Sequence, residues 1–218
     1  MKNRPILIFL FLTLYTCSQN IENVLSKNLD YENRSVKIEL SNGISFDLGY
    51  SWDVLSNNTR IILEEYVDKV MAVPIDYNTS LPFAANLYNR DNEVIGIMNV
   101  RIYPEQEVSQ NEIKNISSFE VDFFDSELKK GIENSLSQAN IKLVEWKGTD
   151  LSTVNDKLFL ISNYRRTSAV NKETIFSVYL FRFLDNEKSF TMTLSHNELN
   201  TDIYFSEIIN IGSSIIVD

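Results

Sequence analysis

His196 is the only histidine of the chain and the first residue to consider as a catalytic base. It ends the segment 188–196, in which apolar and polar residues alternate as in a strand with one buried face. A catalytic histidine needs a nucleophile and an orienting carboxylate beside it. Ser195 and Glu198 are close in sequence, but neighbouring side chains on a strand point to opposite faces. We therefore predict a structural or surface histidine, and no enzyme activity.

Cys17 is the only cysteine, and its position indicates lipid attachment. A basic start, with Lys2 and Arg4, precedes the apolar run 6–14, which is shorter than the about 20 residues that span a bilayer. This pattern is typical of a secretory signal. Residues 14–17, Leu-Tyr-Thr-Cys, resemble the bacterial lipobox, which implies lipidation of Cys17. The alternative is an ordinary signal peptide with Cys17 incidental. With one histidine and a lipidated cysteine, zinc and haem lack ligands, so no metal or cofactor is predicted.

Four acidic residues, Glu120, Asp122, Asp125 and Glu127, gather near the start of a helix predicted over about 118–139. They could bind calcium or manganese, or Asp122 and Asp125 could serve a carboxylate-dependent hydrolase. The simpler interpretation is that acidic side chains favour the positive end of a helix dipole. No EF-hand spacing is present. We favour the dipole interpretation and keep the cation-binding module and the hydrolase as alternatives.

Two pairs of side chains could form a binding surface. Arg165 and Arg166 end a predicted strand and could recognise an anionic group, although such a pair more often faces water or an acidic neighbour. Tyr50 and Trp52 follow the first predicted hairpin and could line a groove. The alternative for Trp52 is a place in the core between sheet and helices.

Composition limits the classes of partner. The chain has 218 residues, 44% of them hydrophobic, and a net charge of −10. This is the composition of a folded domain. An acidic surface repels phosphate backbones, which argues against nucleic-acid binding. We expect a signal peptide over 1–16, a lipid-anchored linker over 17–34 and one domain over 35–218.

Apolar patterning predicts the elements of this domain. Strands are expected at 35–41, 44–48, 82–88, 94–103, 141–147, 157–166, 174–184 and 188–196, and helices at 58–72, 109 onward, 118–139 and 201–215. Asn42-Gly43 is a strong hairpin signal, and Ser109 with Glu112 fits a capping box. The segment 174–184 is apolar on both alternating faces, so it needs cover on both sides. The expected architecture is an α+β fold, an antiparallel sheet with helices on both faces.

This order of elements resembles the Mog1/PsbP-like group, which includes the DcrB-type bacterial lipoproteins. The resemblance rests on the segment 43–52, Gly-Ile-Ser-Phe-Asp-Leu-Gly-Tyr-Ser-Trp, and on the aromatic strand 175–183 followed by 190–195 and a C-terminal helix. The usual proline before the tryptophan is absent. The resemblance implies an α/β/α sandwich and accessory or binding roles, without shared catalytic residues. We thus expect a non-enzymatic lipoprotein of the bacterial cell envelope, at the outer membrane or periplasmic face, which binds a partner protein.

Overall fold

A computed structural model describes residues 35–62, 80–89, 91–103 and 108–218, without the side chains of 200–204. These residues belong to one structural unit, Asn33–Asp218. The predicted signal peptide, Cys17 and the linker lie outside the described residues. So does most of the helix predicted over 58–72, of which residues 57–62 are described and helical.

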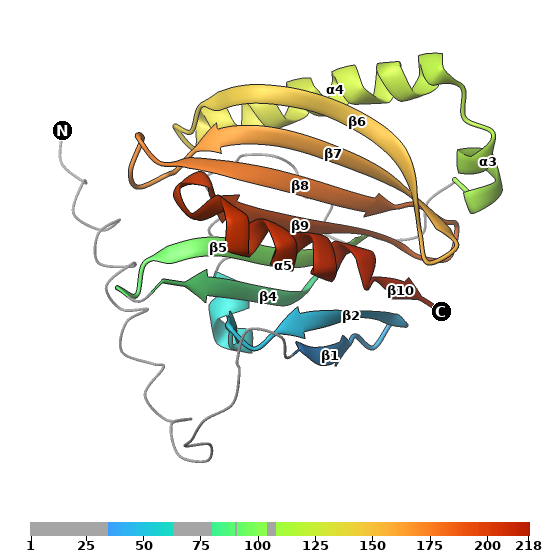
Figure 1. The fold of residues 1–218 in the computed structure, drawn as a ribbon. Helices are drawn as coiled ribbons and strands as arrows, with labels where there is room; N and C mark the ends of the chain where they lie inside the picture. Colours follow the sequence, from blue (N-terminus) through green and yellow to red (C-terminus); the bar gives the residue numbers. More distant parts are fainter. Residues whose placement is uncertain (1–34, 63–79, 90, 104–107) are drawn as a thin grey trace. The chain divides into compact units, whose positions relative to one another are not determined.

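In the described residues a seven-stranded antiparallel sheet has the order β3-β4-β5-β9-β8-β7-β6 (Figure 1). Strands β4 to β9 correspond to predicted strands, whereas the short β3 was not predicted. Their bounds are β3 Trp52–Val54, β4 Ser80–Tyr88, β5 Val94–Tyr103, β6 Leu143–Val154, β7 Lys157–Thr167, β8 Ile175–Phe183 and β9 Ser189–Asn197. β6 is longer than predicted, because 148–154 continues the strand beyond a bulge. A tight turn at Asn155-Asp156, both with positive φ, leads directly into β7.

β8 shows why the sheet is covered on both faces. Phe181 and Phe183 pack in the main core with Ile208 of helix α5, Thr201–Ser213. Val178 and Leu180 point the other way and pack in a smaller cluster with Leu136 of helix α4, Ser118–Gln138. Figure 1 shows α4 and α5 on opposite sides of the sheet. The expectation of an antiparallel sheet between helices is therefore confirmed.

The α5 side has a second component that the sequence patterns did not predict as a separate layer. β1 Ser35–Glu39, β2 Ile44–Gly49 and β10 Ile216–Val217 form a three-stranded sheet of their own. Phe46 of β2 meets Phe83 of β4 edge to face, with ring centroids 5.2 Å apart. The helix predicted to reach 215 ends at Ser213, and the chain then pairs with β2. The small sheet and α5 together cover this face of the large sheet.

Both α3, Gln110–Lys114, and α4 begin with a capping box. Ser109 and Glu112 form the predicted one, and Ser117 and Glu120 form a second. Each box satisfies backbone donors that a helix start leaves free. The capping box of Ser117 and Glu120 fixes the residue at which α4 starts. The start of the helix in turn determines which acidic side chains of α4 point toward the sheet.

Candidate functional site

Arg165 lies in a network of charged groups near the end of β7. Its Nε donates to Glu198 Oε1 at 2.7 Å, and its Nη2 donates to Glu198 Oε2 at 2.7 Å. Nη1 donates to Glu145 Oε2 at 3.2 Å, and the Ser177 hydroxyl donates to Glu198 Oε1 at 2.7 Å. Hydrogen bonds from Arg165 hold the pKa of Glu198 below its ordinary value, and Glu198 raises the pKa of Arg165. The guanidinium is thus occupied by two carboxylates of the chain itself.

Arg166 points to the opposite face of the sheet. Its guanidinium carbon lies 5.2 Å from the centre of the Phe176 ring, and its Nη1 donates to the Thr167 carbonyl at 3.1 Å. Burial lowers the pKa of Arg166. Because successive strand residues alternate in direction, the two arginines do not form one anion-binding pair.

Tyr50 and Trp52 are likewise separated. The Tyr50 side chain is exposed, whereas Trp52 is buried in the core with 5% of its surface accessible. The indole Nε1 of Trp52 donates to Glu207 Oε2 at 3.0 Å, which ties β3 to α5. The structure therefore gives Trp52 a packing role and leaves Tyr50 as the residue of this pair that a partner could touch.

Three of the four acidic residues near the start of α4 make separate contacts, and the fourth, Asp122, is exposed. Glu120 caps the helix, where hydrogen bonds from Ser117 lower its pKa. Asp125 accepts from Trp146 Nε1 at 3.0 Å, and Glu127 pairs with Lys130 at 2.6 Å. Within the described ranges, no three His, Cys, Asp or Glu side chains come together in a way that could hold a metal ion.

His196 is 2% exposed and lies among aromatic rings. Its ring stacks on Tyr179 at 6.3 Å between centroids and meets Phe205 of α5 edge-on at 6.5 Å. Burial lowers the pKa of His196 and favours the neutral ring. Ser195 points away and its hydroxyl donates to the Ile97 carbonyl at 3.3 Å. The geometry therefore pairs His196 with aromatic partners and not with its neighbouring serine.

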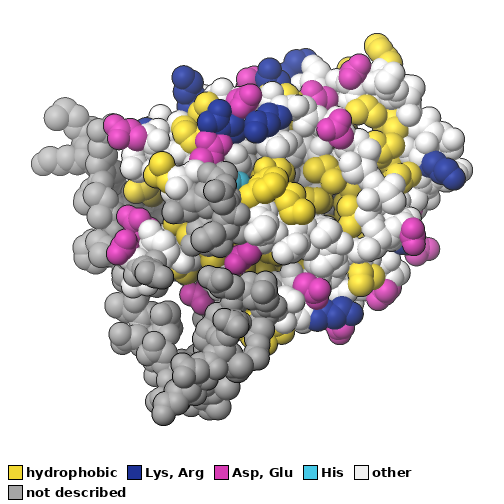
Figure 2. Space-filling model, viewed as in Figure 1, with side chains coloured by type: hydrophobic (Ala, Val, Ile, Leu, Met, Phe, Trp, Pro, Cys, Tyr) yellow, Lys and Arg dark blue, Asp and Glu magenta, His cyan; other side chains and the backbone are white. Residues whose placement is uncertain are grey.

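Beside His196 the large sheet carries an apolar surface that α5 covers only in part. We call it the open face and define it by Ile161, Tyr179, Phe205 and Ile209. Ile161 and Tyr179 are half-buried, and Phe205 and Ile209 are each 43% exposed. Figure 2 shows hydrophobic side chains gathered in the middle of this side of the molecule, next to the single histidine. Contiguous exposed apolar surface of this kind is typical of interaction sites.

The open face was missed at the sequence level. In the sequence, the apolar pairs Tyr204/Phe205 and Ile208/Ile209 of the helix predicted over 201–215 indicate a single buried side. The structure buries Ile208, Ile211 and Gly212 and leaves Phe205 and Ile209 on the flank. The usable signal was the width of the apolar stripe, which is larger than one buried helix face requires.

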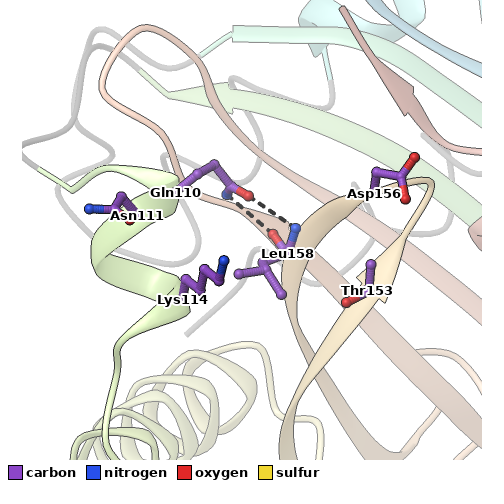
Figure 3. Close-up of a pocket in the computed structure, with 6 residues that line it drawn as sticks. All are labelled: Gln110, Asn111, Lys114, Thr153, Asp156 and Leu158. Carbon is purple, nitrogen blue, oxygen red and sulfur yellow. Dashed lines mark hydrogen bonds between the residues drawn. The ribbon is translucent and has the colours of Figure 1, made fainter.

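A shallow cavity of about 420 Å³ lies between α3 and the hairpin of β6 and β7 (Figure 3). It is lined by Gln110, Asn111, Lys114, Thr153, Asp156 and Leu158. The Gln110 amide is fixed to the strands, since its Nε2 donates to the Leu184 carbonyl at 2.8 Å and its Oε1 accepts from the Leu158 N–H at 3.0 Å. The lining has one carboxylate, that of Asp156. The hydrolase hypothesis requires two carboxylates, those of Asp122 and Asp125, and neither lines this cavity.

Comparison with known proteins supports the fold. No family model matches the chain, and no curated protein matches it. Among solved structures, it is similar to cyanobacterial PsbP (CyanoP) from Synechocystis sp. PCC 6803, with a TM-score of 0.54 and 12% identity over 90% of this chain and 99% of that one. The chain therefore has the PsbP-like α+β fold, as the resemblance predicted.

Two further structures are less similar. The Ran-binding protein Mog1p of Saccharomyces cerevisiae matches with a TM-score of 0.44 and 10% identity, over 84% of this chain and 95% of that one. LpqN of Mycobacterium tuberculosis, involved in cell envelope biogenesis, matches with a TM-score of 0.38 and 10% identity, over 84% and 90%. The assignment of the fold rests on the cyanobacterial protein alone.

Proposed function

We propose that the chain is a non-enzymatic lipoprotein of the bacterial cell envelope whose PsbP-like domain binds a partner protein. The observation that carries the proposal is the open face, an exposed apolar surface next to the paired charges around Arg165. Arg165, Glu145 and Glu198 satisfy one another, so they frame the surface without presenting a reactive group. Such a surface is suited to protein contact rather than to chemistry.

The envelope location rests on the N-terminal sequence. The basic start, the short apolar run and Cys17 are the parts of a lipoprotein signal. Thioether-linked diacylglycerol with an acylated amine gives more than one chain, which anchors stably. None of the helices in the described ranges has the length and apolar character needed to cross a bilayer. An acidic chain gains nothing from anionic headgroups, so the lipid is proposed as the sole membrane contact.

Intact-mass analysis of protein from the native host tests the anchor. We expect the mass of residues 17–218 plus acyl groups, and loss of that added mass in Cys17→Ser. A chain that begins at Met1, or a trimmed chain without acyl mass, would exclude lipidation and the location built on it.

Site-specific photocrosslinking tests partner binding. A photoreactive phenylalanine analogue placed at Phe205 is expected to yield one reproducible adduct in host membranes. The same analogue at Tyr50 maps how far the contact extends. Val170, which is 74% exposed in the turn between β7 and β8, is the matched control and should give no such adduct. Equal labelling at all three positions, or none at Phe205, would contradict partner binding at the open face.

A further inference from the structure

β6 is the outermost strand of the large sheet, next to β7, and no described strand pairs with its other edge (Figure 1). It has 12 residues. Two register irregularities interrupt its pairing with β7, both before Gly148, and from there to Val154 the pairing is regular. The backbone N–H and C=O groups that face outward along 148–154 are therefore in position to hydrogen-bond another strand.

The side of β6 that faces α5 has a gap at Gly148. Gly148, Asp150 and Ser152 pair with Asn163, Ile161 and Phe159, so they lie on the same side as the open face. No atom lies within 4 Å of the position that a Cβ on Gly148 would take. A large apolar side chain on an added strand can cover such a glycine and extend toward Tyr179, which pairs with Asn163.

Asp150 supplies the charge that distinguishes the possible partners. It is exposed at the rim of the open face, and its carboxylate makes no ion pair or hydrogen bond within the described part of the chain. Pairing of β6 with a second copy would bring two such carboxylates close together on chains that each carry −10. A segment with a basic residue is therefore a better match than β6 of another copy.

We propose that 148–154 of β6 binds an extended segment of the partner protein as an additional antiparallel or parallel strand. The segment carries a large apolar residue over Gly148 and a lysine or arginine two positions away, opposite Asp150. This inference deepens the proposed partner-binding function and rests on it. The apolar residue supplies most of the affinity, and the basic residue sets the register.

A synthetic peptide tests this with the full chain in detergent. The probe is fluorescently labelled Thr-Val-Phe-Val-Lys-Val-Thr, followed by polarisation. Replacing its Phe by Ala is expected to weaken binding about tenfold or more, the value of one buried ring. Replacing its Lys by Glu is expected to weaken binding about threefold, as for one exposed cross-strand charge pair. Amide hydrogen exchange should slow along 148–154 and nowhere else on the sheet.

Charge reversal on the protein gives a matched pair of variants. Asp150→Lys should weaken binding of the Lys peptide and strengthen binding of the Glu peptide. Asp122→Lys, the same change on the exposed side of α4, should leave the ratio of the affinities for the two peptides unchanged. Absence of binding, protection elsewhere than on β6, or a β6-to-β6 dimer would overturn the proposal. If crosslinks at Phe205 persist in Asp150→Lys while β6 stays unprotected, partner binding stands and strand addition fails.

Discussion

At the scale of single residues, the charged and aromatic groups beside the open face hold neighbouring elements together. The Glu198 carboxylate accepts hydrogen bonds from Arg165 Nε and Nη2 and from the Ser177 hydroxyl. These bonds join β7, β8 and the segment after β9. The His196 ring packs against Tyr179 and Phe205, whose rings also contact each other. Glu198, Ser177 and His196 are of types that often do chemistry, and here each contacts a neighbouring side chain of this network or of the aromatic cluster. Their effect is to keep the sheet and α5 in register.

Glu198→Gln tests whether the hydrogen bonds between Arg165 and Glu198 stabilise the domain. The variant keeps the size of the side chain but loses the charge-assisted bonds to Arg165, which we expect to lower the free energy of unfolding by about 0.5–1 kcal/mol, a value already reduced for solvent screening. Urea titration measures the change. Glu127→Gln breaks the exposed pair with Lys130 and is the control, expected to leave the midpoint unchanged. An equal loss in both variants would contradict a special role for the Arg165 network.

The pH dependence of stability tests His196. Burial lowers its pKa, so the unfolded chain takes up a proton near pH 6.5 while the folded chain takes it up only at lower pH. The free energy of unfolding should therefore fall as the pH drops below about 6.5, by at most about 1.4 kcal/mol per pH unit from this group. The chain has one histidine, so His196→Gln should flatten the curve between pH 6.5 and 5. An unchanged slope would show that His196 is accessible to protons in the folded state.

At the scale of elements, α5 lies close to the sheet because of Gly212. A Cβ on this residue would lie 2.4 Å from the Phe181 ring, far inside van der Waals contact. The close approach buries Ile208 and Ile211 against the main core. On the same helix Phe205 and Ile209 stay exposed and contribute to the open face.

Two glycine substitutions separate this packing effect from helix propensity. Gly212→Ala is expected to destabilise the domain by about 1–3 kcal/mol, the usual cost of overpacking a core. Gly131→Ala in α4 meets nothing within 4 Å and is expected to stabilise by about 0.5–1 kcal/mol, since alanine favours a helix interior. Thermal unfolding of both variants measures the difference. Stabilisation by both variants would show that Phe181 moves aside at little cost.

At the scale of the whole domain, the last strand links the small sheet to the rest. Val217 of β10 is buried and belongs to the main core, and its strand pairs with β2. The Asp218 N–H donates to the Gly43 carbonyl at 3.0 Å, which closes the hairpin against the C-terminal segment. Contacts between β2 and β10, which lie near opposite ends of the domain's sequence, favour cooperative unfolding of the two sheets.

Val217→Ala should lower the free energy of unfolding by about 1–2 kcal/mol, because it removes buried apolar surface. Ile216→Ala is the matched control on the neighbouring, 41% exposed residue and should change it by less than about 0.5 kcal/mol. Urea unfolding followed by tryptophan fluorescence and by circular dichroism gives both values. Separate transitions by the two probes would contradict cooperative coupling of the two sheets.

The sequence by itself determined the local features of this protein. Asn42-Gly43 marked the first hairpin, Ser109 with Glu112 marked the start of α3, and the apolar alternation of 174–184 required cover on both faces. These signals come from residues a few positions apart, whose turn geometry, capping bonds and face alternation are set locally. They suffice for the α+β class and for most of the elements, but not for the short strands β3 and β10.

The tertiary structure alone decided which side chains meet. Trp52 bonds to Glu207 and Arg165 to Glu198 across 155 and 33 positions, and β10 closes a sheet that begins with β1. Local patterns cannot predict such contacts, because they depend on strand order and on how closely a helix packs. The burial of Trp52, the open face and the edge position of β6 among the described strands all follow from that long-range pairing.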